Sequence, residues 1–157
     1  APDRYDALAR AMAAEGDAHA PILLGHSMGG CVVARAVTGG WIPAPRGMVL
    51  SSPGLVPNIN LVQRAAARVG RRIAPSLRVP HGLPLERLSH DPAVAPAMRA
   101  DPLVHDRVTP RLVGFMLDAG ERAIADAARC TVPTLLLVAG DDHLVRPEGA
   151  RRFHARM

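Results

Sequence analysis

A serine between glycines is the feature of this sequence with the clearest chemical meaning. Residues 25–30 read GHSMGG, the spacing G-x-S-x-G, and they lie between an apolar run and a run of small residues. This is the context of a strand-to-helix turn that exposes a nucleophilic serine in a strained backbone. A Cβ at the neighbouring glycines would clash there. The turn would present the Ser27 hydroxyl to substrate and aim the Met28 backbone N–H at a developing oxyanion.

Two alternatives concern the same segment. A glycine-rich helix start can instead pack closely against a strand or bind phosphate, but phosphate-binding fingerprints use other glycine spacings. His26 is a tempting general base. Because it is adjacent to Ser27 and leaves the turn in another direction, it cannot easily take the proton of that hydroxyl, and we interpret it as structural.

A candidate acid follows a later apolar run. Asp141 and Asp142 come directly after residues 132–138, so a carboxylate there would emerge at the same sheet edge as Ser27. Its role would be to hold a histidine in the correct tautomer and to stabilise its cation. An acidic loop taken alone is more often a solvated turn. Together with the serine turn, it indicates a catalytic acid.

The elements that position these residues alternate between helix and strand. Such alternation predicts an α/β fold, in which helices flank a parallel sheet. The expected helices are residues 3–16, 29–37, a long one from 110, and one from 147. The expected strands are residues 21–25, 48–51 and 132–138.

The middle of the chain has a different composition. Prolines and arginines are frequent between residues 56 and 108, and no strand is convincing there. Residues 60–73 place Leu61, Ala65, Val69 and Ile73 on one helical stripe. Asp91-Pro92 and Thr109-Pro110 are typical helix starts. We therefore expect a core half at residues 1–55, a helical cap inserted at 56–108 over the carboxyl ends of the strands, and a second core half at 109–157.

Composition excludes several classes of function. The 157 residues carry a net charge of +5, and all 19 basic residues are arginines. No aromatic side chains interleave with them, so we expect no nucleic-acid partner, and at most weak contact with anionic lipid surfaces. Cys31 and Cys130 show no metal-ligand spacing and are typical of buried thiols in a reducing, cytoplasmic compartment. No apolar run is long enough for a transmembrane helix and no signal peptide is visible.

Four segments together resemble a known family. The motifs GHSMGG, MVLSSPGL, LSHDPAV with RADPLV, and PTLLLVAGDDHLV are similar to those of the monoacylglycerol lipase and lysophospholipase group of α/β-hydrolases, which overlaps the serine aminopeptidase-like hydrolases. The resemblance implies an esterase of single-acyl lipids without cofactor or metal. It implies Ser27 as nucleophile, Asp142 rather than Asp141 as acid, Met28 as one oxyanion donor, and a cap that shapes an acyl-chain channel.

The expected triad order in this fold is Ser, Asp, His. After Asp142 only His143 and His154 remain; His143 adjoins the acid, and His154 falls in the last expected helix. We therefore expect that the catalytic histidine is not in this chain, that the chain is an internal fragment, and that it is nearly inactive alone. The remaining histidines, among them His90, are more typical of surface or cap hydrogen bonding. A short-chain esterase, a peptidase and an inactive binding module stay open as alternatives.

Overall fold

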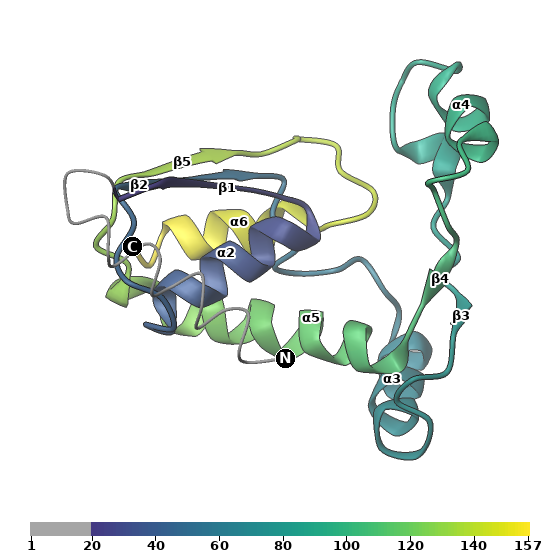
Figure 1. Ribbon diagram of the computed structural model, residues 1–157, viewed down its shortest axis with the longest axis horizontal. Coiled ribbons are helices and arrows are strands. Elements are labelled where there is room, and N and C mark those ends of the chain that lie inside the picture. The colour runs from purple at the N-terminus through teal and green to yellow at the C-terminus, as the bar shows by residue number, and fades with distance from the viewer. Residues whose placement is uncertain (1–19) are drawn as a thin grey trace.

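A three-stranded parallel sheet forms the centre of the molecule. The computed structural model describes residues 20–157, so the helix expected at 3–16 lies outside the described residues. Strands β1 (Ile22–His26), β2 (Gly47–Ser51) and β5 (Thr134–Leu137) lie in the order β1-β2-β5 (Figure 1). His26 pairs with Ser51 and Ser51 with Leu137, so the three strands end at a common edge.

Three helices cover one face of this sheet. They are α2 (Met28–Thr38), α5 (Pro110–Ala125) and α6 (Pro147–His154), with a short 3₁₀ turn, η3 (Ala127–Arg129), after α5 (Figure 1). The expected helix starts are present. Thr109 caps α5 by accepting a hydrogen bond from the Leu112 N–H, and proline occupies the first turn of both α5 and α6.

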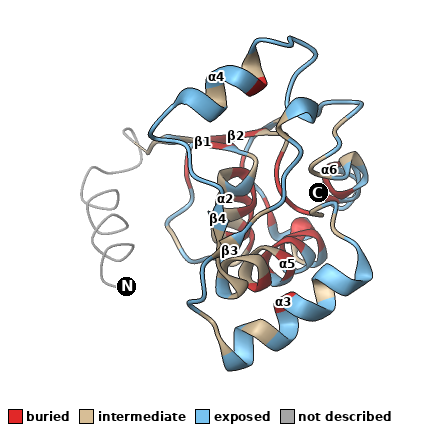
Figure 2. Cartoon of the chain, turned by 90° about the vertical axis from the view of Figure 1, so that its right-hand side faces the viewer, coloured by how far each residue is buried: buried red, intermediate tan, exposed pale blue. Residues whose placement is uncertain are grey.

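The core lies between the sheet and these helices (Figure 2). Cys31 and Ala34 of α2 are fully buried, and so are Leu50 of β2 and Phe153 of α6. The small side chains of α2 allow α5 to pack directly against it. The core is therefore built mainly from aliphatic and small side chains, as the low aromatic content indicates.

The opposite face of the sheet carries exposed apolar side chains. Ile22 and Leu24 of β1 are 64% and 71% exposed, and Leu135 and Leu137 of β5 are 55% and 49% exposed. Alternate residues of a strand point to opposite faces, so these four share one face. Within residues 20–157 no helix covers that face (Figure 1).

The segment between β2 and α5 extends from one end of the molecule (Figure 1). It contains α3 (Leu61–Ile73), β3 (Val79–Pro80), the 3₁₀ turn η2 (Leu85–Arg87), α4 (Val94–Ala100) and β4 (Arg107–Val108). β3 and β4 pair antiparallel and carry η2 and α4 away from α3 (Figure 1). The sequence indicated no strand here, because two-residue strands are too short to show an alternating pattern.

Two details of this segment differ from the sequence-based expectation. Leu61, Val69 and Ile73 of the predicted apolar stripe are 83%, 56% and 78% exposed, and only Ala67 of α3 is buried. Helix α3 instead packs on α5 through small residues and ion pairs, including Arg71 with Asp118 at 2.5 Å.

The second difference is at Asp91. Its side chain accepts a hydrogen bond from the Ala93 N–H at 2.8 Å in a turn. Helix α4 begins only at Val94, so Asp91 is not its N-cap.

A glycine inside α5 provides a test of this packing. Glycine normally weakens a helix interior, so replacement by alanine should help. At Gly120, however, a Cβ would collide with the backbone carbonyl of Leu55. We therefore expect Gly120→Ala to destabilise the protein by roughly 1–3 kcal/mol through overpacking, measured by thermal or urea unfolding.

Gly114→Ala is the matched control on the same helix. The three atoms nearest to a Cβ there all belong to the exposed, flexible side chain of Arg71, namely Cδ at 2.7 Å, Nη1 at 3.3 Å and Nε at 3.4 Å. We expect this variant to be close to neutral in stability. Equal stability of the two variants would contradict the packing of Leu55 against α5.

Candidate active site

Ser27 lies in a strained turn between β1 and α2. Its φ of 50° falls in the left-handed region, which residues other than glycine rarely adopt. Three backbone hydrogen bonds hold it: its N–H donates to the Ser51 carbonyl at 2.9 Å, and its carbonyl accepts from the N–H groups of Cys31 at 3.2 Å and Gly54 at 2.7 Å. Such over-determined strain is common at functional sites.

The glycines around Ser27 differ in the space that each leaves for a side chain. A Cβ at Gly25 would lie 2.6 Å from the Gly29 carbonyl oxygen, and one at Gly30 would lie 2.8 Å from the Pro53 Cα. At Gly29 a Cβ would meet nothing within 4 Å. The expected clash is therefore confirmed at Gly25 and wrong at Gly29. The close approach of α2 to the chain after β2 falls on Gly30 instead.

Met28 begins helix α2 directly after Ser27. Its backbone N–H belongs to the first turn, whose N–H groups have no partner within the helix. The positive end of the helix dipole lies at the same place. This arrangement can stabilise a negative charge that develops beside Ser27.

Asp142 is held by the backbone of its own loop. Its Oδ1 accepts hydrogen bonds from the N–H groups of Leu144 and Val145, both at 2.9 Å, which leaves the other carboxylate oxygen for a further donor. Asp141 is 75% exposed, and its carboxylate lies 3.5 Å from His143 Nε2. The fixed and partly buried carboxylate is thus that of Asp142.

The acid loop is tied to the chain that leaves β2. Val145 bridges to Pro57, and the Asn58 N–H donates to the Leu144 carbonyl at 2.9 Å. The Asn58 side-chain amide also donates to the His143 carbonyl at 3.0 Å. These contacts hold the loop at the edge of the sheet where Ser27 also lies.

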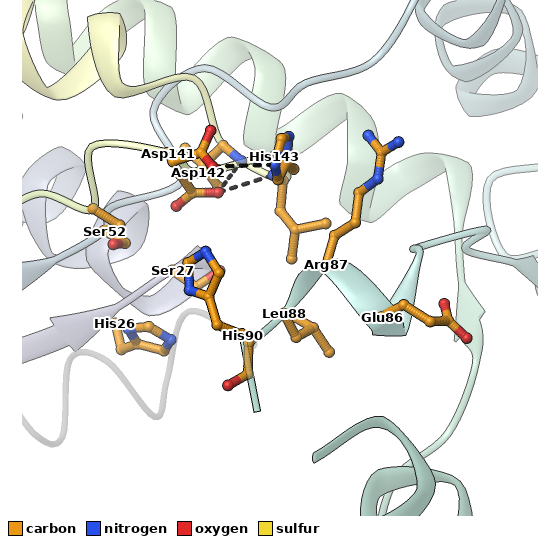
Figure 3. A pocket seen from close by; sticks show the side chains of 14 residues that line it. His26, Ser27, Ser52, Glu86, Arg87, Leu88, His90, Asp141, Asp142 and His143 are labelled. Atoms are coloured by element: carbon orange, nitrogen blue, oxygen red, sulfur yellow. Dashed lines mark hydrogen bonds and ion pairs between the residues drawn. The ribbon is translucent and has the colours of Figure 1, made fainter. Parts of the chain in front are cut away.

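Ser27 and Asp142 line one pocket of about 390 Å³. Its other walls are the acid loop, Ser52 after β2, and residues 86–90 of the inserted segment (Figure 3). The sequence assigned no role to Ser52 or Arg87, and it indicated only surface or cap hydrogen bonding for His90. A positive φ of 40° at Ser52 marks its turn, but this property has no sequence signature.

Several histidines of the described residues lie in the inserted segment or in the pocket lining. His81 and His105 accept local hydrogen bonds from the Leu83 and Arg107 N–H groups, as expected for cap residues. The His26 ring nitrogen lies 3.2 Å from Ser51 Oγ, which fits a structural role. His90 differs, because its ring projects from the inserted segment into the pocket towards Ser27 (Figure 3).

Both cysteines are buried, as predicted. Cys31 lies in α2 one turn beyond Ser27, and burial raises the pKa of its thiol to about 11. A thiol with such a pKa is almost entirely protonated at neutral pH and is a poor nucleophile. Cys31 therefore does not compete with Ser27 for the chemistry of the pocket.

Comparison with known proteins identifies the family of the chain. The family model described as serine aminopeptidase, S33 matches residues 3–157. The chain belongs to this family. Two bacterial relatives are phospholipase YtpA of Bacillus subtilis, 37% identical over 126 residues, and a monoacylglycerol lipase of Mycolicibacterium smegmatis, 34% identical over 134 residues. These matches cover 78% and 83% of this chain but 49% and 47% of the relatives, so the chain spans about half their length.

Solved structures show the same fold. The monoacylglycerol lipase of Paleococcus ferrophilus superposes with a TM-score of 0.87 at 34% identity, over 99% of this chain and 59% of that one. A soluble monoglyceride lipase variant from Saccharomyces cerevisiae gives a TM-score of 0.82 at 18% identity, over 98% of this chain and 55% of that one. The fold is therefore that of an α/β-hydrolase, matched over a part of its length.

No helix within residues 20–157 combines the length and the apolar character that a membrane crossing demands.

The two adjacent glycines of the turn give a matched pair of variants. We expect Gly30→Ala to push α2 away from Pro53, displace Ser27 and lower the unfolding temperature. Gly29→Ala adds a methyl group in open space and should leave the unfolding temperature unchanged. Thermal unfolding followed by circular dichroism measures the effect. An unchanged unfolding temperature of Gly30→Ala would contradict the close approach at Pro53.

Proposed function

We propose that this chain supplies the nucleophile and acid of a serine carboxylic-ester hydrolase. The observation that carries the proposal is that strained Ser27 and hydrogen-bonded Asp142 line the same pocket. Met28 provides one oxyanion N–H. A histidine outside this chain acts as the base, because the triad order Ser, Asp, His places it after Asp142, where His143 adjoins the acid and His154 lies in α6. Residues 56–108 are the cap over the site.

The proposed reaction has two steps. The Ser27 Oγ attacks the acyl carbonyl carbon while the histidine takes its proton, and the Met28 N–H stabilises the resulting oxyanion. Collapse breaks the ester C–O bond, and the alcohol leaves with the proton from the histidine. Water then attacks the acyl-enzyme in the same way and releases the fatty acid and free Ser27. Asp142 orients the histidine and stabilises its cation throughout.

A single-acyl lipid is the proposed substrate class. The relatives include a monoacylglycerol lipase and a phospholipase. The inserted segment also carries an apolar groove of about 500 Å³ between α3 and β3, lined by residues such as Val69, Ile73 and Leu77. An apolar groove of this volume suits an acyl chain. The exposed arginines and apolar residues of α3 are compatible with weak contact to a lipid surface.

Two alternatives to a lipid esterase can be distinguished by experiment. A short-chain esterase or a peptidase would use the same residues and differ only in its preferred substrate. An inactive binding module would keep the fold without turnover. Reaction with a serine-directed phosphonate separates an active site from an inactive one. We expect one label on the complete protein, at Ser27, and none on the Ser27→Ala variant.

The missing histidine has a measurable consequence. Loss of the triad histidine lowers kcat by about a million-fold in a protease where it was measured. We expect the isolated 157 residues to hydrolyse a soluble ester more slowly than the complete protein by a factor of that order. Comparable turnover by the two would show that a base lies within this chain, and the assignment of an outside histidine would be wrong.

The two adjacent aspartates test the acid. We expect Asp142→Asn to lower kcat by roughly 10⁴-fold, because an amide no longer holds the histidine in the correct tautomer. Asp141→Asn removes an exposed carboxylate that pairs with His143, and should change kcat only a few-fold. Rates are measured on the complete protein with one soluble ester. A larger loss at Asp141 would reverse the assignment.

A further inference from the structure

The cap turn at residues 84–88 faces the nucleophile across the pocket. The Arg87 N–H donates to the Pro84 carbonyl at 2.9 Å, and the Leu88 N–H donates to the Leu85 carbonyl at 3.1 Å. These bonds close a 3₁₀ turn, after which Ser89 and His90 follow. Five consecutive residues, 86–90, line the same pocket as Ser27 and Asp142. The turn therefore meets any substrate whose ester reaches Ser27.

The acidic groups of the pocket are already engaged. Glu86 forms an ion pair with Arg99, and hydrogen bonds from its own backbone N–H and from Arg99 lower its pKa. Asp141 pairs with His143, and Asp142 accepts two backbone N–H groups. Arg87 is the cation of the pocket lining that has no ion-pair partner among residues 20–157.

Arg87 is placed to bind a head group at the rim of the pocket and not the ester that reacts at Ser27. Figure 3 shows its side chain rising from the cap turn on the side of the pocket where His143 lies, while the His90 ring points towards Ser27. A substrate whose ester lies at Ser27 and whose alcohol part follows this wall of the pocket would bring its head group to the guanidinium.

We propose that Arg87 binds a phosphate carried by the alcohol part of a single-acyl ester, so that the pocket selects anionic over neutral lipids. This inference rests on the proposed function of Ser27. A guanidinium presents its N–H donors in a planar fork that matches two phosphate oxygens, and such charge-assisted hydrogen bonds are about twice as strong as neutral ones. A neutral glycerol hydroxyl carries no charge and cannot accept a paired, charge-assisted hydrogen bond from the guanidinium. The phosphate is only bound, and the bond that breaks is the acyl C–O bond.

Binding to a Ser27→Ala protein tests the proposal without turnover. The probes are octanoylglycerol and octanoylglycerol 3-phosphate, which have the same acyl chain and are used as monomers. We expect the phosphate-bearing lipid to bind more tightly than the neutral one, and Arg87→Gln to raise the Kd of the phosphate-bearing lipid about tenfold or more. The same variant should change the Kd of the neutral lipid less than about twofold. Arg87→Lys keeps the charge but loses the planar fork of donors, so its Kd for the phosphate-bearing lipid should lie between those of the parent and Arg87→Gln.

Arg72→Gln is the matched control. Arg72 is an exposed arginine of α3, in the same inserted segment but outside the pocket lining, so this variant loses the same charge elsewhere. It should bind both lipids as the parent does. Equal weakening by Arg72→Gln and Arg87→Gln would show general attraction to a basic surface and overturn the proposal. So would equal affinity of the parent for the two lipids.

Turnover by the protein with Ser27 intact separates the two proposals. If a soluble neutral ester is hydrolysed but Arg87→Gln does not change the ratio of kcat/KM for the two lipids, the head-group assignment is wrong and the esterase assignment stands. If no ester is hydrolysed while Arg87 still controls phosphate binding, the esterase assignment fails and Arg87 remains a phosphate site.

Discussion

The strained backbone at Ser27 is the constraint on which the rest of the site depends. A φ of 50° costs free energy that must be offset by surrounding contacts. The bonds to Ser51, Cys31 and Gly54 come from the neighbouring strand, the following helix and the chain beyond β2. Each requires close approach of backbones, which explains why Gly25 and Gly30 carry no side chain. The sheet and helix α2 thus fix the position of one hydroxyl group.

The second constraint is the shared edge of the parallel sheet. β1, β2 and β5 end in register, so the residues that follow each strand meet on one side. Asp142 reaches this edge on a loop fixed twice, by its own Asx-type hydrogen bonds and by the bridge between Val145 and Pro57. The segment that follows β2 therefore also holds the loop that carries Asp142. Substitution of Asn58 should therefore shift the position of Asp142, although the two residues are far apart in sequence.

The packing of the sheet is asymmetric in the described residues. One face is closed by α2, α5 and α6, where Gly120 admits the Leu55 carbonyl and small residues of α2 admit α5. The other face exposes Ile22, Leu24, Leu135 and Leu137. Contiguous apolar surface of this kind normally meets a further layer of protein.

The sequence by itself determined the strands, the main helices, the serine turn and the acid loop, because each depends on local signals: apolar runs, capping residues and glycine spacing. Thr109-Pro110 and GHSMGG are examples, and each is confirmed at its position. Tertiary structure alone decided which carboxylate is fixed, that Leu61, Val69 and Ile73 are exposed, and that Arg87 and His90 reach the pocket. These properties depend on contacts between residues distant in the chain, and no local periodicity encodes them.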